Sequence, residues 1–339
     1  MHTDSRRAIA IWLLVCCGLI FAMVVLGGVT RLTRSGLSIV EWQPIMGALP
    51  PLSEAQWEET FAKYRQTPEY LKVNLGMSLT EFKSIFWVEY AHRLLGRVIG
   101  LAFLLPFLYF LARGRIERRL APKLAALFVL GGLQGALGWY MVASGLVDNP
   151  HVSPYRLTAH LGLAVLIYGY MFWLALDLLR PRTASIAATG ARRHTWALLA
   201  LVFVMILSGG FVAGTRAGFA FNTFPLMNGA WVPPGVLALE PWWRNLFENV
   251  ATVQFNHRLL AYLLIAMTVG LWFSVRRIGA ARRAALPVYA ALALQVALGI
   301  GTLLWVVPIP LAAAHQAGAL LVFTAVIYLA HTLRGAISR

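Results

Sequence analysis

Long apolar stretches alternate with short polar segments over the whole chain. Eight of them are long enough to cross a bilayer as helices, at 8–28, 85–111, 124–143, 157–179, 195–214, 251–274, 286–306 and 312–333. A spanning helix needs about 20 mostly apolar residues, and it satisfies its backbone polar groups internally. The strands of an outer-membrane barrel are shorter and alternate polar with apolar positions, so these continuous runs exclude that fold. The pattern predicts an all-α integral membrane protein with eight transmembrane helices.

Composition and the placement of charge agree with this prediction. Of the 339 residues, 59% are hydrophobic and 12% are charged, a balance that requires the bilayer as solvent. The net charge is +16, but the arginines and lysines gather in alternate connections, near 6–7, 113–123, 180–193 and 276–283, and at the C-terminus. This is the positive-inside pattern, and it places both termini in the cytoplasm. The basic excess therefore indicates topology and not a nucleic-acid partner.

The first apolar run resembles a signal peptide because basic residues precede it. It is as long as a full span and no small-residue cleavage site ends it, so we expect an uncleaved first helix. Cys16 and Cys17, the only cysteines, are adjacent inside this span. Adjacent cysteines do not bridge easily, so the sequence predicts no disulfide framework.

Four motifs recur in the same order in the two halves of the chain. The first span ends in "VVLGGVTR" (24–31) and the fifth in "ILSGGFVAGTR" (206–216). "HRLLG" and "HRLLA" follow in spans two and six, "LQGALG" and "LQVALG" in spans three and seven, and a histidine opens spans four and eight. Units of four spans enter the membrane in the same direction. The repeat therefore predicts two tandem parallel four-helix bundles with pseudo-two-fold symmetry, an N-terminal half (1–184) and a C-terminal half (185–339).

The connection 29–84 is the one long outer segment. Within it, residues 53–70 have apolar side chains at helical spacing and begin with a Ser-x-x-Gln capping pattern. We expect a short amphipathic helix on the outer surface, which acts either as a lid or as packing.

Four of the eight histidines fall at one depth of the predicted bundles. They are His92, His160, His257 and His315, and each lies in the first two turns of an even-numbered span. Ionisable side chains in the hydrocarbon zone are costly and mark functional sites. Opposed imidazoles on facing helices suit the two axial positions of haem iron. Zinc or copper is the alternative, but such sites usually add cysteine, carboxylate or closely spaced histidines, so haem is favoured.

Arginines and small residues near the outer boundary extend this interpretation. Arg93 and Arg258 directly follow two of the histidines. Among the outer arginines (positions 31, 34, 93, 97, 216 and 258) these two are the best candidates to pair with anionic haem propionates. Snorkelling to lipid phosphates is the alternative. Small residues expected to leave room for a planar macrocycle are Gly96, Gly100, Gly162, Ala261 and Gly318.

One acidic residue breaks the symmetry of the two halves. Glu89 lies three residues before His92 and on the same helical face, whereas Gln254 occupies the equivalent place before His257. A buried carboxyl group can exchange a proton or stabilise a positive charge that develops nearby. The alternative is a structural glutamate that hydrogen-bonds a loop.

The chain resembles the haem A synthase family, which oxidises haem O to haem A for cytochrome oxidases. The matching text is "LGGVTRLTRSGLSIVEWQPIMGALPPL", "EYLKVNLGMSLTEFKSIFWVEYAHRLLGR" and "QFNHRLL", together with the histidines that open spans four and eight, and it covers essentially the whole chain. The resemblance implies a haem b, which carries electrons, between His257 and His315. It implies substrate haem O between His92 and His160.

The resemblance also implies the chemistry and the setting. One macrocycle methyl group is hydroxylated in successive steps to a formyl group, and the family's essential glutamate falls on Glu89 beside His92 and His160. Some members carry a cysteine pair in outer loops; this chain has none there, which speaks against a thiol relay. The implied location is the bacterial inner membrane, with the haem sites toward the periplasm. Expected partners are haem O, membrane lipid, the farnesyltransferase that makes haem O and cytochrome oxidase assembly factors, and a homo-oligomer is compatible with the sequence.

Two other functions use the same histidines. A dihaem electron carrier for quinones has no need of the asymmetric glutamate. A haem transporter needs an opening path and leaves its haem chemically unchanged. From the residues alone the dihaem protein ranks first, and with the resemblance the enzyme leads.

Overall fold

The computed structural model describes residues 3–42, 46–147, 150–180 and 189–334. Within these ranges eight helices are long and apolar enough to cross a membrane. They are α1 (Thr3–Leu32), α4 (Leu79–Ala112), α5 (Ala121–Ala143), α6 (Pro154–Leu179), α7 (Thr189–Gly214), α8 (Val250–Val275), α9 (Gly279–Leu304) and α10 (Ile309–Thr332). Each one contains most or all of one predicted apolar run, so the all-α membrane fold is confirmed.

A capping box and two left-handed residues accompany the places where helix ends differ from the apolar runs. The helix α4 begins six residues before the predicted run because Ser78 and Glu81 form a capping box, in which each side chain accepts a hydrogen bond from the other residue's backbone N–H. The helix α9 ends at Leu304, two residues before the run does. Val306 and Val307 there have φ angles of 57° and 59°, which the right-handed helix does not allow.

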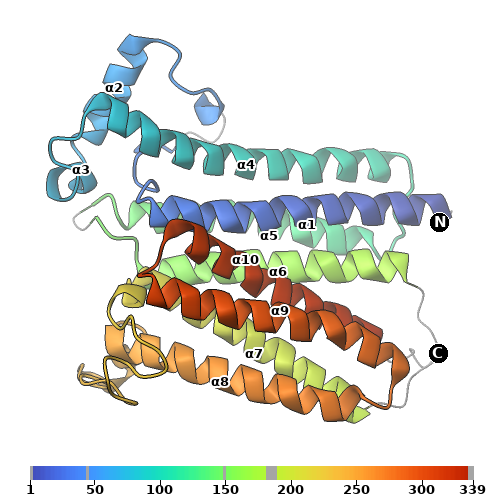
Figure 1. Ribbon diagram of the computed structural model, residues 1–339. Helices are drawn as coiled ribbons and strands as arrows, with labels where there is room; N and C mark the ends of the chain where they lie inside the picture. The colour runs from blue at the N-terminus through green and yellow to red at the C-terminus, as the bar shows by residue number, and fades with distance from the viewer. Residues whose placement is uncertain (1–2, 43–45, 148–149, 181–188, 335–339) are drawn as a thin grey trace.

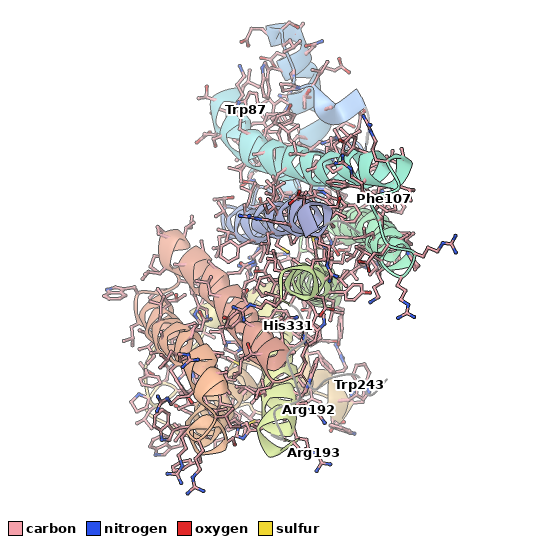
Figure 2. The ribbon with its side chains drawn as sticks, turned by 90° about the vertical axis from the view of Figure 1, so that its right-hand side faces the viewer. Trp87, Phe107, Arg192, Arg193, Trp243 and His331 are labelled. Carbon is pink, nitrogen blue, oxygen red and sulfur yellow. The ribbon has the colours of Figure 1, made fainter. Side chains whose placement is uncertain are left out.

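The spans alternate in direction, and the start of α1 and the end of α10 lie at the same end of the molecule (Figure 1). In the N-terminal half, α1 and α5 each pack against both α4 and α6. In the C-terminal half, α7 and α9 each pack against both α8 and α10. The view along the helices shows α1 and α5 between α4 and α6 (Figure 2). The same pattern of contacts therefore recurs with the sequence repeat.

The two halves meet where α6 contacts α7 and where α10 contacts α1, α6 and α7. One apolar core runs through this contact and includes Leu13 of α1, Leu198 of α7 and Leu329 of α10. Cys16 and Cys17 are free thiols buried in the same core. The grouping into two related bundles stays a prediction from the repeat. Its boundary at 184 and 185, and the basic residues 182 and 339, lie outside the described residues.

The outer segment after α1 contains the short helices η1 (Met46–Ala48), α2 (Glu54–Tyr64) and α3 (Pro68–Lys72). The predicted capping pattern is confirmed, because Ser53 and Gln56 form a capping box at the start of α2. The helix ends at Tyr64, six residues before the predicted end, and α3 starts after Thr67. The buried face of α2 packs against Phe82 and Phe86 of α4. This contact favours packing over a lid.

Candidate functional site

The four candidate histidines lie on four helices that all start at the same end of the molecule (Figure 1). His92 is on α4, His160 on α6, His257 on α8 and His315 on α10. Three of them lie within about two turns of the helix start. His92 lies deeper in α4 because the capped extension of that helix adds turns before the apolar run begins.

Each histidine ring lies against a glycine of an odd-numbered span. The four contacts are Gly27–His92, Gly138–His160, Gly209–His257 and Gly299–His315, and a Cβ on the glycine would lie 3.3, 3.0, 3.5 and 2.8 Å from the nearest ring atom. Gly27 and Gly209 hold the same place in the repeat, as do Gly138 and Gly299. A Cβ at Gly299 would have to displace the ring, one at Gly138 or Gly27 would press on it, and one at Gly209 would touch it at ordinary contact distance. The repeat therefore positions all four imidazoles with the same local packing.

Polar side chains orient two of these histidines. The hydroxyl of Ser208 on α7 lies 3.1 Å from Nδ1 of His257. A hydrogen bond at Nδ1 fixes the ring and leaves Nε2 to bind a metal. Gln134 of α5 donates to the backbone carbonyl of His160 at 3.0 Å, and its Nε2 lies 3.4 Å from Nε2 of that ring.

The histidines fit a haem better than a polyhedral metal cluster. Nδ1 of His160 and Nδ1 of His315 are buried and have no hydrogen-bond partner within the described part of the chain. Buried imidazoles of this kind are costly unless something binds them. Nowhere in the described residues do three histidine, cysteine, aspartate or glutamate side chains gather as they do around zinc. One imidazole pair in each half suits the two axial positions of a haem iron.

Glu89 is buried, and its carboxylate is surrounded by hydrogen-bond donors. Its Oε2 accepts from the backbone N–H groups of Ser38 and Ile39, at 2.8 and 2.9 Å, and from the Ser38 hydroxyl at 2.7 Å. Its Oε1 accepts from Nε and Nη2 of Arg93, at 3.0 and 2.6 Å. A carboxylate offers about four lone-pair positions, and these donors engage them. Glu89 therefore fastens the loop after α1 to α4. This is the alternative predicted from the sequence, a structural glutamate that hydrogen-bonds a loop.

Arg93 also binds the loop that follows α1. Beyond its ion pair with Glu89, it donates to the carbonyl of Ile39 at 2.7 Å and to that of Glu41 at 3.0 Å. Its guanidinium lies 5.7 Å from the ring centre of Trp42. The arginine predicted to pair with a propionate is therefore engaged with the outer loop from several sides.

In the C-terminal half an amide replaces the acid and holds a different backbone group. Gln254 donates to the carbonyl of Phe221 at 3.2 Å, and Arg258 donates to the same carbonyl at 2.9 Å. The Oε1 atom of Gln254 is buried, and no described residue donates to it. Glu89 thus accepts hydrogen bonds from N–H groups of the loop after α1, whereas Gln254 donates one to a carbonyl of the loop after α7. At this position a neutral amide replaces the carboxylate before the second histidine pair.

Other outer arginines lie close to one another. Arg34 and Arg216 hold equivalent places after α1 and α7, and both have left-handed backbone angles, with φ of 54° and 59°. Burial and then the charge of Arg34 lower the pKa of Arg216. Burial raises the pKa of Glu69, and the charges of Arg34 and Arg216 oppose that rise. Arg31, at the end of α1, donates to the carbonyl of Ala213 at the end of α7. These residues form a basic cluster between the halves.

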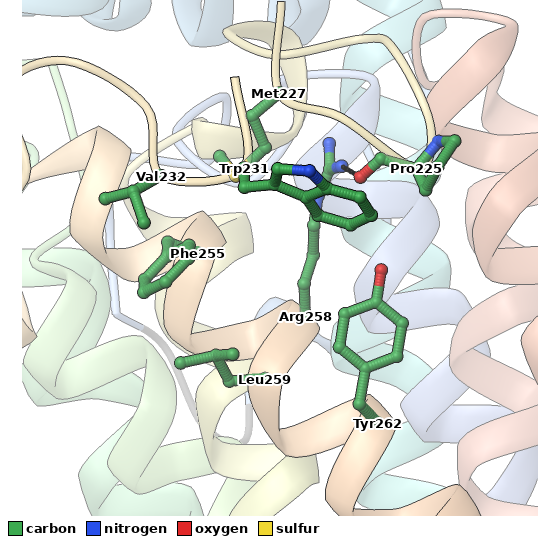
Figure 3. A pocket seen from close by; sticks show the side chains of 8 residues that line it. All are labelled: Pro225, Met227, Trp231, Val232, Phe255, Arg258, Leu259 and Tyr262. Carbon is green, nitrogen blue, oxygen red and sulfur yellow. Dashed lines mark hydrogen bonds between the residues drawn. The ribbon is translucent and has the colours of Figure 1, made fainter. Parts of the chain in front are cut away.

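A small cavity of about 210 Å³ lies between α8 and the loop after α7, beside Arg258 (Figure 3). The stem of Arg258 rises past Trp231 toward the carbonyl of Pro225, and Phe255 and Tyr262 also line the space. Binding cavities for small organic ligands measure about 300–1,000 Å³, so this one is too small for a porphyrin.

Several residues of the site are not apparent from the sequence pattern alone. Of the small residues expected to leave room for a macrocycle, Gly162 packs against α7, where a Cβ on it would lie 2.8 Å from Leu207, whereas Gly100 faces open space. The glycines that do face the histidines belong to the repeated "GG" and "ALG" motifs, so the repeat was the signal that could have found them. Ser208 and Gln134 are single polar residues inside apolar spans, the kind of position that marks function in a membrane.

Comparisons with known proteins agree on one family. The family model described as "Cytochrome oxidase assembly protein" (COX15-CtaA) matches residues 10–327. A protein of Nitrosospira multiformis named "Heme A synthase" is 62% identical over 335 residues, which are 97% of this chain and 94% of that protein. Proteins with the same name from Nitrosomonas eutropha and Parvibaculum lavamentivorans are 53% and 54% identical, and they cover 98% of this chain each and 95% and 96% of their own lengths.

Proposed function

The chain belongs to the cytochrome oxidase assembly protein family, and from that premise we propose that it is an oxidoreductase that converts haem O to haem A. One observation carries the proposal. The two histidine pairs pack against glycines in the same way, but one helical turn before the first histidine of each pair the N-terminal half has a buried carboxylate, Glu89, and the C-terminal half an amide, Gln254. A protein that only carried electrons between two haems would need no such difference. An enzyme needs one site for chemistry and one for electrons.

The N-terminal half provides the substrate site in this proposal. His92 and His160 hold the iron of haem O, and Gly27 and Gly138 fix the two rings. When bound, haem O would supply the iron and the methyl group that becomes a formyl group; this change adds an oxygen atom, from water or dioxygen, and passes the removed electrons to an external oxidant. The chain's contribution is to orient the macrocycle and to set the charge around the methyl group.

Glu89 supplies that charge. Ser38, Ile39 and Arg93 hold its carboxylate in place by hydrogen bonds, so that its negative charge has a defined position. Removal of electrons from a methyl carbon develops positive charge, which a preorganised anion stabilises in a site of low dielectric constant. Gln254, at the equivalent position of the C-terminal half, is uncharged.

The C-terminal half provides the electron site. His257 and His315 would hold a resident haem b, and the hydroxyl of Ser208 orients the ring of His257 by its hydrogen bond at Nδ1. Without a carboxylate nearby, this half is suited to electron transfer. We place both sites toward the periplasm and both termini in the cytoplasm, in keeping with the basic cytoplasmic connections.

The decisive experiment identifies the haems that the protein holds and makes. The protein is purified in detergent, supplied with haem O and an oxidant, and its haem is extracted with acid and separated by reversed-phase chromatography. Haem A, or its alcohol precursor, together with haem B supports the proposal. Haem B alone, at two per chain and unchanged by added haem O, would identify a dihaem carrier. Haem O that is bound and released unaltered would identify a transporter.

A further inference from the structure

The residue after the last candidate ligand connects the two halves. Gln316 follows His315 on α10, and its side chain crosses to α1. There its Nε2 donates to the backbone carbonyl of Val24 at 2.8 Å, although the two residues are 292 positions apart in the sequence. Val24 is buried and Gln316 is half-buried, so this hydrogen bond is partly shielded from solvent. Polar contacts between helices in such surroundings hold the helices in register.

Two adjacent glycines of α1 face the two sites. A Cβ on Gly27 would lie 3.3 Å from Nε2 of His92, and a Cβ on Gly28 would overlap the amide of Gln316. Successive residues of a helix point in directions about 100° apart, so one turn of α1 presents one glycine to each half. The smallness of Gly28 lets Gln316 reach the Val24 carbonyl. The smallness of Gly27 lets the ring of His92 rest on the same turn.

The equivalent contact between α6 and α7 has no such bond. Leu161 follows His160 in the place that Gln316 has after His315. Gly210 of α7, the counterpart of Gly28, faces Thr158, and a Cβ on it would lie 2.9 Å from the threonine hydroxyl. That hydroxyl is buried and has no hydrogen-bond partner in the described structure. Within the described residues, the residue after the ligand candidate therefore bonds the other half on α10 and not on α6, although α6 and α10 also meet elsewhere, where Tyr168 and Thr324 share a hydrogen bond.

We propose that Gln316 couples the two haem sites, so that the state of the C-terminal haem changes how tightly the N-terminal half holds its own haem. The inference rests on the proposed assignment of haem b and haem O to the two halves. Gln316 acts as a positioning residue. His315 would hold the iron of haem b, so a displacement of the start of α10 would move Gln316, whose hydrogen bond would carry the displacement to the Val24–Gly28 turn against which the ring of His92 lies.

Thermodynamic reciprocity makes the proposal measurable without turnover. If the oxidation state of haem b alters the affinity at His92 and His160, binding there must shift the reduction potential of haem b by an equal free energy. We expect the coupling to be about fivefold or more in affinity, the lower end of the usual range for linked sites. The probe is zinc protoporphyrin, which is fluorescent and carries a metal that does not change oxidation state.

The experiment uses the full chain loaded with haem b in detergent. Zinc protoporphyrin is titrated once with haem b oxidised and once with haem b reduced, and the ratio of the two dissociation constants is the result. Gln316→Met keeps the length of the side chain and removes the donor. Gly28→Ala breaks the same bond from α1 without a change on the helix that carries the ligand. Gly18→Ala, where a Cβ in α1 would meet nothing within 4 Å, is the matched control.

A ratio of about fivefold in the wild type and in Gly18→Ala, which falls to one in Gln316→Met and in Gly28→Ala, supports the coupling. A wild-type ratio of one overturns it, as does a wild-type ratio that survives both substitutions. If Gln316→Met loses its haem b, the ratio in Gly28→Ala decides. The outcome is independent of catalysis. A protein that failed to make haem A but showed the Gln316-dependent ratio would contradict the proposed function and leave the coupling intact.

Discussion

Replacement of Glu89 by glutamine tests two roles of its carboxylate: the ion pair with Arg93, which the structure shows, and the negative charge proposed to act in the N-terminal site. Glutamine has one oxygen in place of two. If that oxygen faces Ser38 and Ile39, the three hydrogen bonds to the loop survive and the two from Arg93 are lost. If it faces Arg93, the three to the loop are lost. In either orientation the guanidinium keeps its charge and no longer has a counter-ion.

The structure sets the magnitude of this loss. The side chain of Glu89 is 3% exposed and that of Arg93 is 13% exposed, so water does not replace the missing partner. Removal of one member of a buried ion pair costs about 3–5 kcal/mol, whereas replacement of both members by apolar residues is often close to neutral. We therefore expect Glu89→Gln to be clearly less stable than the wild type, and Glu89→Gln/Arg93→Met to recover most of the difference.

Two measurements follow the two roles. The midpoint of thermal unfolding in detergent reports the ion pair, and chromatography of the extracted haem reports the chemistry. Haem A formation is expected to be lost in both variants, because neither has a negative charge beside the N-terminal histidines. Glu248→Gln is the matched control. Glu248 pairs with Arg244 over the same spacing and the same 2.6 Å, but the two side chains are 29% and 43% exposed. Solvent screens such a pair, so its loss changes stability little.

Two results would refute the reasoning. Formation of haem A by the double variant would mean that the fixed negative charge is not needed and that Glu89 serves the loop alone. An unchanged unfolding midpoint in Glu89→Gln would mean that the ion pair does not hold the chain after α1 onto α4.

Three further substitutions probe the packing around the sites. Gly299→Ala puts a Cβ 2.8 Å from the ring of His315 and is expected to abolish haem b binding, whereas Gly131→Ala, where a Cβ meets nothing within 4 Å, keeps full haem content by absorbance. Ser208→Ala removes the hydrogen bond to the C-terminal imidazole on α8 and is expected to weaken haem b binding by about 10–100-fold, measured by haem transfer to apomyoglobin. Ser53→Ala removes the cap of α2 and should lower the stability of the outer segment by about 1 kcal/mol, seen as faster proteolysis there with haem content unchanged.

The parts of the fold that the sequence predicted are those with a local cause. A run of apolar residues forms a spanning helix wherever it occurs, because the bilayer leaves the backbone no other partner. The cap at Ser53 was also visible, since a capping box lies within four residues. The helix ends were less predictable. The start of α4 depends on Ser78, outside the apolar run, and the end of α9 on left-handed backbone angles at Val306 and Val307.

The contacts of the site were predictable only in part. The depth of the four histidines and the isolated acid at 89 stand out because polar residues are rare in spans. The partners of that acid do not stand out. Ser38 is 51 residues away, and it bonds Glu89 partly through a backbone N–H that every residue but proline has. Gln316 and Val24 lie 292 positions apart, so no local pattern relates them.

The packing of α10 against α1 has a consequence for biosynthesis. A ribosome makes α1 first and α10 last, so the N-terminal four spans can assemble while the last span is still unmade. The turn of α1 at Gly27 and Gly28 then lacks its neighbour until the chain is nearly complete. His315 enters the membrane in the same final span. Nascent chains that stop short of residue 309 would therefore lack both His315, the second ligand of the proposed C-terminal haem site, and the packing of α10 against α1.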